Sequence, residues 1–281
     1  GLFDIHTLEW HAPALALAGI TPERLSEPVP ITEVFTGMDL RYAQAMQLPP
    51  DTPFIVGGSD GCLANLGALA VRPGDAVTTI GTSGAVRVIS DRPMPDPLGR
   101  TFSYVLTDRM YVSGGAVNNG GVVLRWFNEN FGPVGVTETE AYRQLAKAAE
   151  QVPAGADGLL FLPYLTGERA PHWDANAKGL FFGVQLHHTK AHFARAVFEG
   201  VVFGIHSVVK VLEENCGPIR MIHANGGFAR SSFWVQLLAD VSGRDVQVAE
   251  NAEGAAAGAS FVVLRALGHI RDFAELADRK S

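Results

Sequence analysis

Two short apolar segments that each stop in a glycine-rich turn constrain this chain most. Residues 54–61 end in Gly-Gly-Ser-Asp-Gly, and residues 77–84 end in Ile-Gly-Thr-Ser-Gly. An apolar run of this length that stops at glycine and small polar residues predicts a strand whose end meets a ligand in an α/β sheet. The first turn carries the carboxylate of Asp60, and the second carries the hydroxyls of Thr82 and Ser83. A base and a turn with free amide donors are what a phosphoryl-transfer site requires.

Each turn also has a purely structural interpretation. Asp60 can hold a local Asx turn, and residues 81–84 can form the tight turn of a hairpin. The second turn is not a Walker A loop, because no lysine follows it. Neither turn identifies a function when it is taken alone.

Composition is typical of a globular enzyme. Of the 281 residues, 47% are hydrophobic and 18% are charged, which a disordered segment would not show. A net charge of −7 without a cluster of Lys and Arg predicts no nucleic-acid partner, and no apolar run is long enough to predict a membrane span. The cysteines, Cys62 and Cys216, are too few for a cysteine-based zinc site and favour a reducing, cytoplasmic setting.

Strands, glycine turns and helices alternate along most of the chain, which predicts an α/β domain. We expect helices at residues 62–70, 122–131, 138–150, 189–214, 231–242 and 253–268, and a short helix at 11–19 ended by glycine. We expect strands at 76–80, 85–89, 102–106, 110–113, 221–224 and 246–249, and a buried strand at 159–164, where the apolar run is continuous. Pro49 and Pro50 mark a connection. We therefore predict two parts, 1–50 and 51–281.

Three further segments could line a ligand. Residues 114–121 form a glycine and asparagine turn before a helix, which is either a flexible loop or the rim of a binding site. Residues 162–173 place Glu168 and Arg169 beside buried-type residues. This favours a structured loop that clamps the domain interface over a solvated surface loop with one ion pair. Gly226 and Gly227 permit close approach to a flat ligand such as adenine, or form a tight connection.

A histidine pair raises the question of a metal. His188 and His192 have the i, i+4 spacing of helical ligands, but no third ligand is evident. We therefore assign no metal-binding residue in this chain.

Four motifs, in this order, resemble the FGGY family of carbohydrate kinases. They are Gly-Gly-Ser-Asp-Gly at 57–61, Ile-Gly-Thr-Ser-Gly at 80–84, Gly-Glu-Arg-Ala-Pro at 167–171 and Asn-Gly-Gly-Phe-Ala-Arg-Ser-Ser at 225–232. Residues 179–183, with the helix that carries Arg195, Glu199 and Gly200, resemble the family's C-terminal signature. The resemblance covers nearly all of residues 50–268. Segments 59–67 and 114–121 most resemble the gluconate kinases.

The resemblance implies an actin-like ATPase fold, related to ribonuclease H, in which this chain is the C-terminal domain of a two-lobe sugar kinase. It implies ATP and Mg²⁺ as cofactors and a sugar acid as substrate, with D-gluconate converted to 6-phosphogluconate. By resemblance, Asp60 is the catalytic base and, with Gly61, contacts the substrate. The nucleotide and its phosphates are assigned to Gly81, Thr82, Ser83, Gly121, Arg125, Gly226, Gly227 and Ser231.

The family's first phosphate turn and first signature are not found in this sequence. We therefore expect residues 1–50 to be the tail of the N-terminal sugar-binding lobe and residues 51–281 to be the C-terminal nucleotide-binding lobe. Three alternatives stay open: a kinase for another polyol or ketose (xylulose, ribulose or glycerol), a catalytically incomplete nucleotide-binding fragment, and a non-catalytic interaction module of the same fold. A homodimer is compatible with each of them.

Overall fold

The computed structural model describes residues 1–248 and 254–278, and a six-stranded sheet lies at its centre. The strand order is β12–β11–β5–β6–β8–β7. β5 pairs in parallel with β11, and β11 with β12, whereas β5–β6, β6–β8 and β8–β7 are antiparallel. The strands are β5 (Asp75–Ile80), β6 (Gly84–Ser90), β7 (Phe102–Thr107), β8 (Met110–Val117), β11 (Met221–Asn225) and β12 (Asp245–Val248). The predicted α/β class is therefore confirmed.

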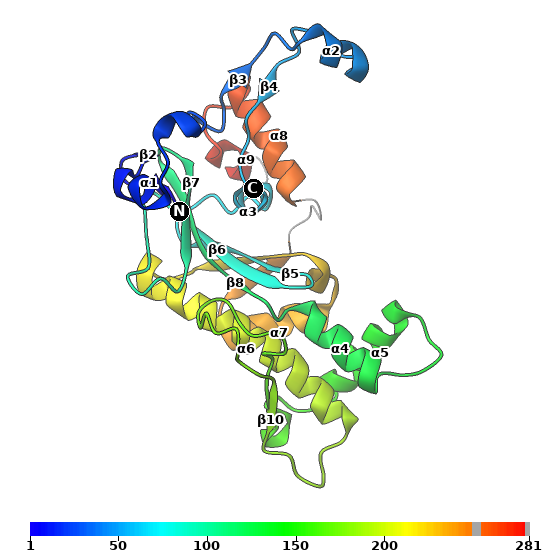
Figure 1. Cartoon of the computed structure of the whole chain (residues 1–281). Coiled ribbons are helices and arrows are strands. Elements are labelled where there is room, and N and C mark those ends of the chain that lie inside the picture. Colours follow the sequence, from blue (N-terminus) through cyan, green and yellow to red (C-terminus); the bar gives the residue numbers. More distant parts are fainter. Residues whose placement is uncertain (249–253, 279–281) are drawn as a thin grey trace.

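Helices cover both faces of this sheet (Figure 1). One face carries α4 (Gly121–Phe131), α5 (Glu138–Glu150), α6 (Lys190–Cys216) and α7 (Ser232–Ser242). The other carries α3 (Asp60–Gly67), α8 (Gly254–Ala266) and α9 (Ala274–Asp278). The predicted long helix is α6, which buries Val197, Val201, Ile205 and Val208 against the sheet because they recur at helical spacing. Within the described residues, no helix combines the length and hydropathy needed to cross a bilayer.

Small residues bring α3 and α8 unusually close. A methyl group added at Gly67 would overlap the carbonyl oxygen of Gly254, and one added at Gly258 would overlap the carbonyl oxygen of Leu63. Only glycine allows the two backbones to approach this closely. This close packing fixes the axis of α3, whose first residue is Asp60.

Residues 1–58 form small elements beyond one end of the sheet (Figure 1). Two antiparallel hairpins pair β1 (Phe3–Asp4) with β2 (Glu9–Trp10) and β3 (Val34–Phe35) with β4 (Phe54–Ile55). Between these two pairs lie α1 (Ala12–Ala18) and the 3₁₀ turn η1 (Pro22–Arg24), whereas α2 (Leu40–Met46) lies between β3 and β4. The predicted short helix is α1, which ends at Gly19 with a left-handed φ of 67°.

The predicted buried strand at 159–164 is wrong in its length and its burial. After the 3₁₀ turn η2 (Ala156–Gly158), strand β9 (Leu160–Leu162) pairs only with β10 (Leu180–Phe182), outside the main sheet. Phe161 is buried, but Leu160 is 47% exposed and Leu162 is 43% exposed. A two-stranded hairpin covers one face only, so alternate residues of an apolar run stay in solvent.

The predicted turn at 114–121 is too long. Residues up to Val117 belong to strand β8, and only residues 118–121 leave the sheet. The two glycines serve packing instead: a methyl group at Gly114 would lie 2.6 Å from the carbonyl oxygen of Val86, and one at Gly115 would lie 2.6 Å from the side chain of Val208. Of the predicted elements at 246–249 and 253–268, residues 249 and 253 lie outside the described residues.

Candidate active site

Three glycine turns that lie far apart in the sequence meet at one end of the sheet. The amide of Gly121 donates to the carbonyl oxygen of Gly81 at 2.6 Å, and the amide of Val122 donates to that of Thr82 at 3.0 Å. Gly226 has a φ of 93°, and a methyl group there would lie 2.9 Å from the carbonyl oxygen of Ile80. The turn 118–121 is therefore hydrogen-bonded to the turn 81–84, and the turn 226–230 packs against Ile80, directly before the turn 81–84.

The outer surface of these turns is open. A methyl group at Gly81 or Gly227 would meet no atom within 4 Å. Thr82 and Ser83 are exposed, and their hydroxyls form no hydrogen bond with the described residues. Phosphate oxygens can accept hydrogen bonds from such hydroxyls, because no side chain covers the glycine turn that carries them. The residues present therefore fit the phosphates of a nucleotide.

The turn 118–121 is held by a buried glutamate. Glu168 is 4% exposed, and its carboxylate accepts hydrogen bonds from the amide of Asn118 at 2.5 Å, from Nδ2 of Asn119 at 3.0 Å and from the amide of Arg169 at 2.8 Å. Asn119 is 1% exposed and also donates to the carbonyl oxygen of Gly167 at 2.7 Å. The loop 162–173 is structured, as predicted. Within the described residues its acidic side chain fixes the asparagine turn.

Asp60 is the first residue of α3, and its carboxylate is exposed. Ser59 caps the helix by accepting from the amide of Cys62 at 3.4 Å. One carboxylate oxygen of Asp60 accepts from the amide of Gly61 at 2.6 Å. This local bond matches the structural interpretation of the turn, but the second oxygen has no hydrogen bond within the described residues.

Arg87 is a residue at the site that the sequence analysis did not identify. It lies on β6, where every other residue is buried. A methyl group at Gly61 would lie 2.7 Å from its Nε atom and 3.1 Å from its Cζ atom, so the guanidinium packs against the start of α3. Burial lowers the pKa of Arg87, and the charge of Asp60 opposes that shift. The signal in the sequence was a single basic residue inside an apolar strand.

Two other residues that were predicted to bind the nucleotide, Ser231 and Arg125, are not among the contacts that join the three turns. Ser231 caps α7, because its hydroxyl accepts from the amide of Trp234 at 3.4 Å. Arg125 lies one turn after Gly121 on α4, is exposed, and is close enough to Tyr142 of α5 for its charge to act on that phenol. The contacts among the three turns do not include the side chain of Arg125.

The histidine pair has structural partners. The Nδ1 atom of His192 completes the cap of α6 with Thr189, and its Nε2 atom lies 3.1 Å from a carboxylate oxygen of Asp157. The Nδ1 atom of His188 accepts from the amide of Gln185 at 3.0 Å. Among the described residues, no group of three His, Cys, Asp or Glu side chains could hold a metal ion.

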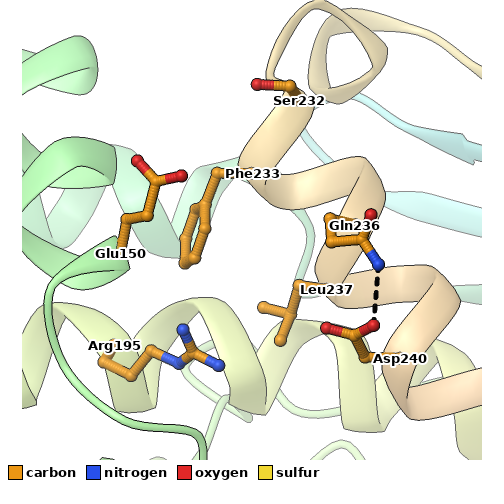
Figure 2. Close-up of a pocket in the computed structure, with 7 residues that line it drawn as sticks. All are labelled: Glu150, Arg195, Ser232, Phe233, Gln236, Leu237 and Asp240. Carbon is orange, nitrogen blue, oxygen red and sulfur yellow. Dashed lines mark hydrogen bonds between the residues drawn. The ribbon is translucent and has the colours of Figure 1, made fainter.

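A separate hollow of about 400 Å³ lies among α5, α6 and α7 (Figure 2). In it the guanidinium of Arg195 lies 5.3 Å from the ring centre of Phe233 and donates to Glu199 at 2.6 Å. Both charged groups are buried. The lining residues are Glu150, Arg195, Ser232, Phe233, Gln236, Leu237 and Asp240. None of these residues was predicted to bind substrate or nucleotide. The contacts of Arg195 with Phe233 and Glu199 give this residue of the sequence motif a packing role.

Comparison with known proteins agrees with this geometry. The model of the FGGY family of carbohydrate kinases, C-terminal domain, matches residues 76–267, and the N-terminal domain model matches residues 1–67. The chain is 45% identical to a gluconokinase of Bacillus subtilis over 99% of its own length and 55% of that protein. It is 33% identical to a xylulose kinase of Staphylococcus epidermidis over 80% of the chain and 45% of that protein.

Solved structures give the same result. A ligand-bound xylulose kinase and a gluconate kinase, both from Lactobacillus acidophilus, each superpose with a TM-score of 0.92 at 34% identity, over 99% of this chain and 56% of theirs. The chain thus spans about half the length of the relatives that it matches. Its central sheet with helices on both faces is the actin-like ATPase fold of these sugar kinases. The chain belongs to the FGGY family of carbohydrate kinases.

Proposed function

We propose that this chain is the nucleotide-binding part of an ATP-dependent kinase that phosphorylates a hydroxyl of a sugar acid, with D-gluconate as the substrate and 6-phosphogluconate as the product. The observation that carries the proposal is the meeting of the turns 81–84, 118–121 and 226–230 through backbone contacts. The 45% identity with a gluconokinase over nearly the whole chain supports gluconate as the substrate.

In the proposed mechanism, Asp60 accepts the proton of the substrate hydroxyl while that oxygen attacks the γ-phosphorus atom of ATP. A bond forms between the sugar oxygen and phosphorus, the bond to the β-phosphate oxygen breaks, and ADP leaves. The amides and hydroxyls of residues 81–84 hold the phosphoryl oxygens as their charge shifts. Magnesium, bound with the nucleotide, supplies further neutralisation of phosphate charge.

Gly227 and Ser231 are proposed to line the adenosine, since the double-glycine turn is open to solvent at Gly227. Gly121 and Arg125 are proposed to lie on the opposite wall of the nucleotide pocket. We propose the division of the chain near residue 51, with residues 1–50 as part of the sugar-binding lobe and residues 51–281 as the nucleotide-binding lobe.

Replacing the proposed base tests this mechanism. In the full-length protein, Asp60→Asn should lower the turnover number by about 10²- to 10⁴-fold, because the amide cannot accept the proton. ATP affinity, measured by calorimetry, should stay within about twofold of wild type, since the phosphate turns are unchanged. An Asp60→Asn protein that keeps a tenth or more of the wild-type turnover would show that Asp60 is not the base.

A kinase for a neutral sugar is the second candidate. A xylulose kinase and a gluconate kinase superpose on this chain equally well, so the fold does not separate them. A panel of gluconate, xylulose, ribulose and glycerol in a coupled ADP assay decides between them. The substrate with the highest kcat/KM identifies the class.

A further inference from the structure

Arg87 is an unusual residue for the centre of a sheet. It is the one Lys or Arg among the six strands of the main sheet, and the only residue of β6 that is not buried. Holding a cation in a mostly buried position costs free energy unless an opposite charge or hydrogen bonds compensate. Its position therefore calls for a compensating group.

The described residues compensate Arg87 only in part. Its guanidinium forms no hydrogen bond and no ion pair with them, and the acidic groups that act on its charge are Asp60, Cys62 and Tyr104. Of these, Cys62 is a buried thiol whose pKa is raised by burial, and Tyr104 is a phenol, so Asp60 is the one full negative charge. Five guanidinium donors thus lie beside the proposed base with unused hydrogen-bonding capacity.

The position of Arg87 relative to the phosphate turn indicates what could bind it. Arg87 is three residues along β6 from Gly84, which corresponds to about 10 Å at the rise of a strand. A substrate whose reacting hydroxyl lies between Asp60 and the turn 81–84 would extend its far end along β6. That separation is comparable to the length of an extended six-carbon sugar acid, whose far end carries a carboxylate.

We propose that Arg87 is a specificity-determining residue that binds the carboxylate of the sugar-acid substrate. The inference rests on the proposed kinase function and adds the group that distinguishes an acid from a neutral polyol. Arginine suits this task because its planar fork binds a carboxylate through two parallel hydrogen bonds. Gly61 is part of the same arrangement, since any side chain there would occupy the space of the guanidinium.

A matched pair of substrates tests the proposal in the full-length protein. Gluconate and gluconamide differ only at C1, where a neutral amide replaces the carboxylate. The wild type should prefer gluconate in kcat/KM, and Arg87→Met should lower kcat/KM for gluconate by about 10- to 100-fold while changing that for gluconamide less than threefold. Arg87→Lys should recover part of the preference, since it restores the charge without the fork.

Three controls separate this role from others. Arg143→Met, which removes an exposed arginine on α5, should leave the preference unchanged. Calorimetry should show weaker gluconate binding by Arg87→Met with unchanged ATP binding; a loss of ATP binding instead would assign Arg87 to the phosphates and overturn the proposal. The melting temperature of Arg87→Met should not fall, because a partly buried cation with no hydrogen bond to the described residues is removed.

Two outcomes would overturn the assignment of Arg87 while leaving the proposed kinase function in place. If the wild type phosphorylates gluconate and Arg87→Met keeps the full preference over gluconamide, only the assignment of Arg87 is overturned. An equal fall in kcat for both substrates would show that Arg87 acts through Asp60 and would also overturn it. A wild type that phosphorylates none of the sugars overturns both proposals.

Discussion

The two sides of the candidate site are built in opposite ways. On the nucleotide side, the turn 118–121 is hydrogen-bonded to the turn 81–84, and Gly226 packs against Ile80 directly before that turn. Buried Glu168 fixes the turn 118–121. On the acceptor side, which comprises Ser59, Asp60, Gly61 and Arg87, both charged groups are partly or fully open to solvent. Within the described residues, the acceptor side has one local hydrogen bond at its carboxylate.

This difference has a physical reason. Phosphate oxygens are recognised by backbone amides, and amides stay in place only when the turns that carry them are fixed. A proton acceptor must instead present a free lone pair to the substrate, so it cannot be satisfied within the protein. The nucleotide side should therefore respond to substitutions through stability, and the acceptor side mainly through turnover.

The largest effect is expected at Glu168. Glu168→Ala removes the acceptor of the part-buried amide of Asn118 and one of the two acceptors of the buried side-chain amide of Asn119, which should lower the free energy of unfolding by about 3 kcal/mol. ATP affinity should fall as well, because the turn 118–121 loses its support. Denaturant unfolding and calorimetry measure the two effects. Glu140→Ala on exposed α5 is the matched control and should cost less than about 1 kcal/mol. A Glu168→Ala protein as stable as wild type would contradict the rigid nucleotide side.

Two glycine substitutions on the nucleotide side should have effects of intermediate size, and they separate stability from ATP binding. A methyl group at Gly121 would lie 2.7 Å from the carbonyl oxygen of Gly81, so Gly121→Ala should destabilise the fold by about 1–3 kcal/mol. Gly81→Ala places its methyl group in open space and should leave the melting temperature unchanged. It should nevertheless lower ATP affinity, because the methyl group occupies the phosphate position. If Gly81→Ala binds ATP like wild type, the phosphates do not lie over this turn.

Periodicity and turn chemistry predicted most of the fold. The predicted α5 has the observed bounds, and α4, α6 and α7 agree within a few residues, because their apolar spacing and caps are local signals. The prediction failed where the partner of a strand decides its environment. The apolar run at 159–164 contains a half-exposed hairpin strand, which no local pattern distinguishes from a central one.

The site was predicted in part, for a related reason. The glycine turns can be recognised in the sequence. The order of the motifs indicated one family for the chain, which the comparisons confirm. Glu168 contacts Asn118 and Asn119, which lie 50 and 49 positions earlier in the chain. Arg87 packs against Gly61, which lies 26 positions earlier. Such contacts depend on the strand order, which the sequence pattern alone did not provide.

The smallest expected effect tests the acceptor side. Ser59→Ala removes the cap of α3 and should cost about 1 kcal/mol in the free energy of unfolding. Because Asp60 and Gly61 lie in the first turn of this helix, fraying there should also lower the turnover number while ATP affinity stays the same. Thr137→Ala removes the corresponding cap of α5, whose hydroxyl accepts from the amide of Glu140 at 3.3 Å. It should cost a similar free energy without changing turnover. Equal turnover in the two variants would mean that the start of α3 does not position the base.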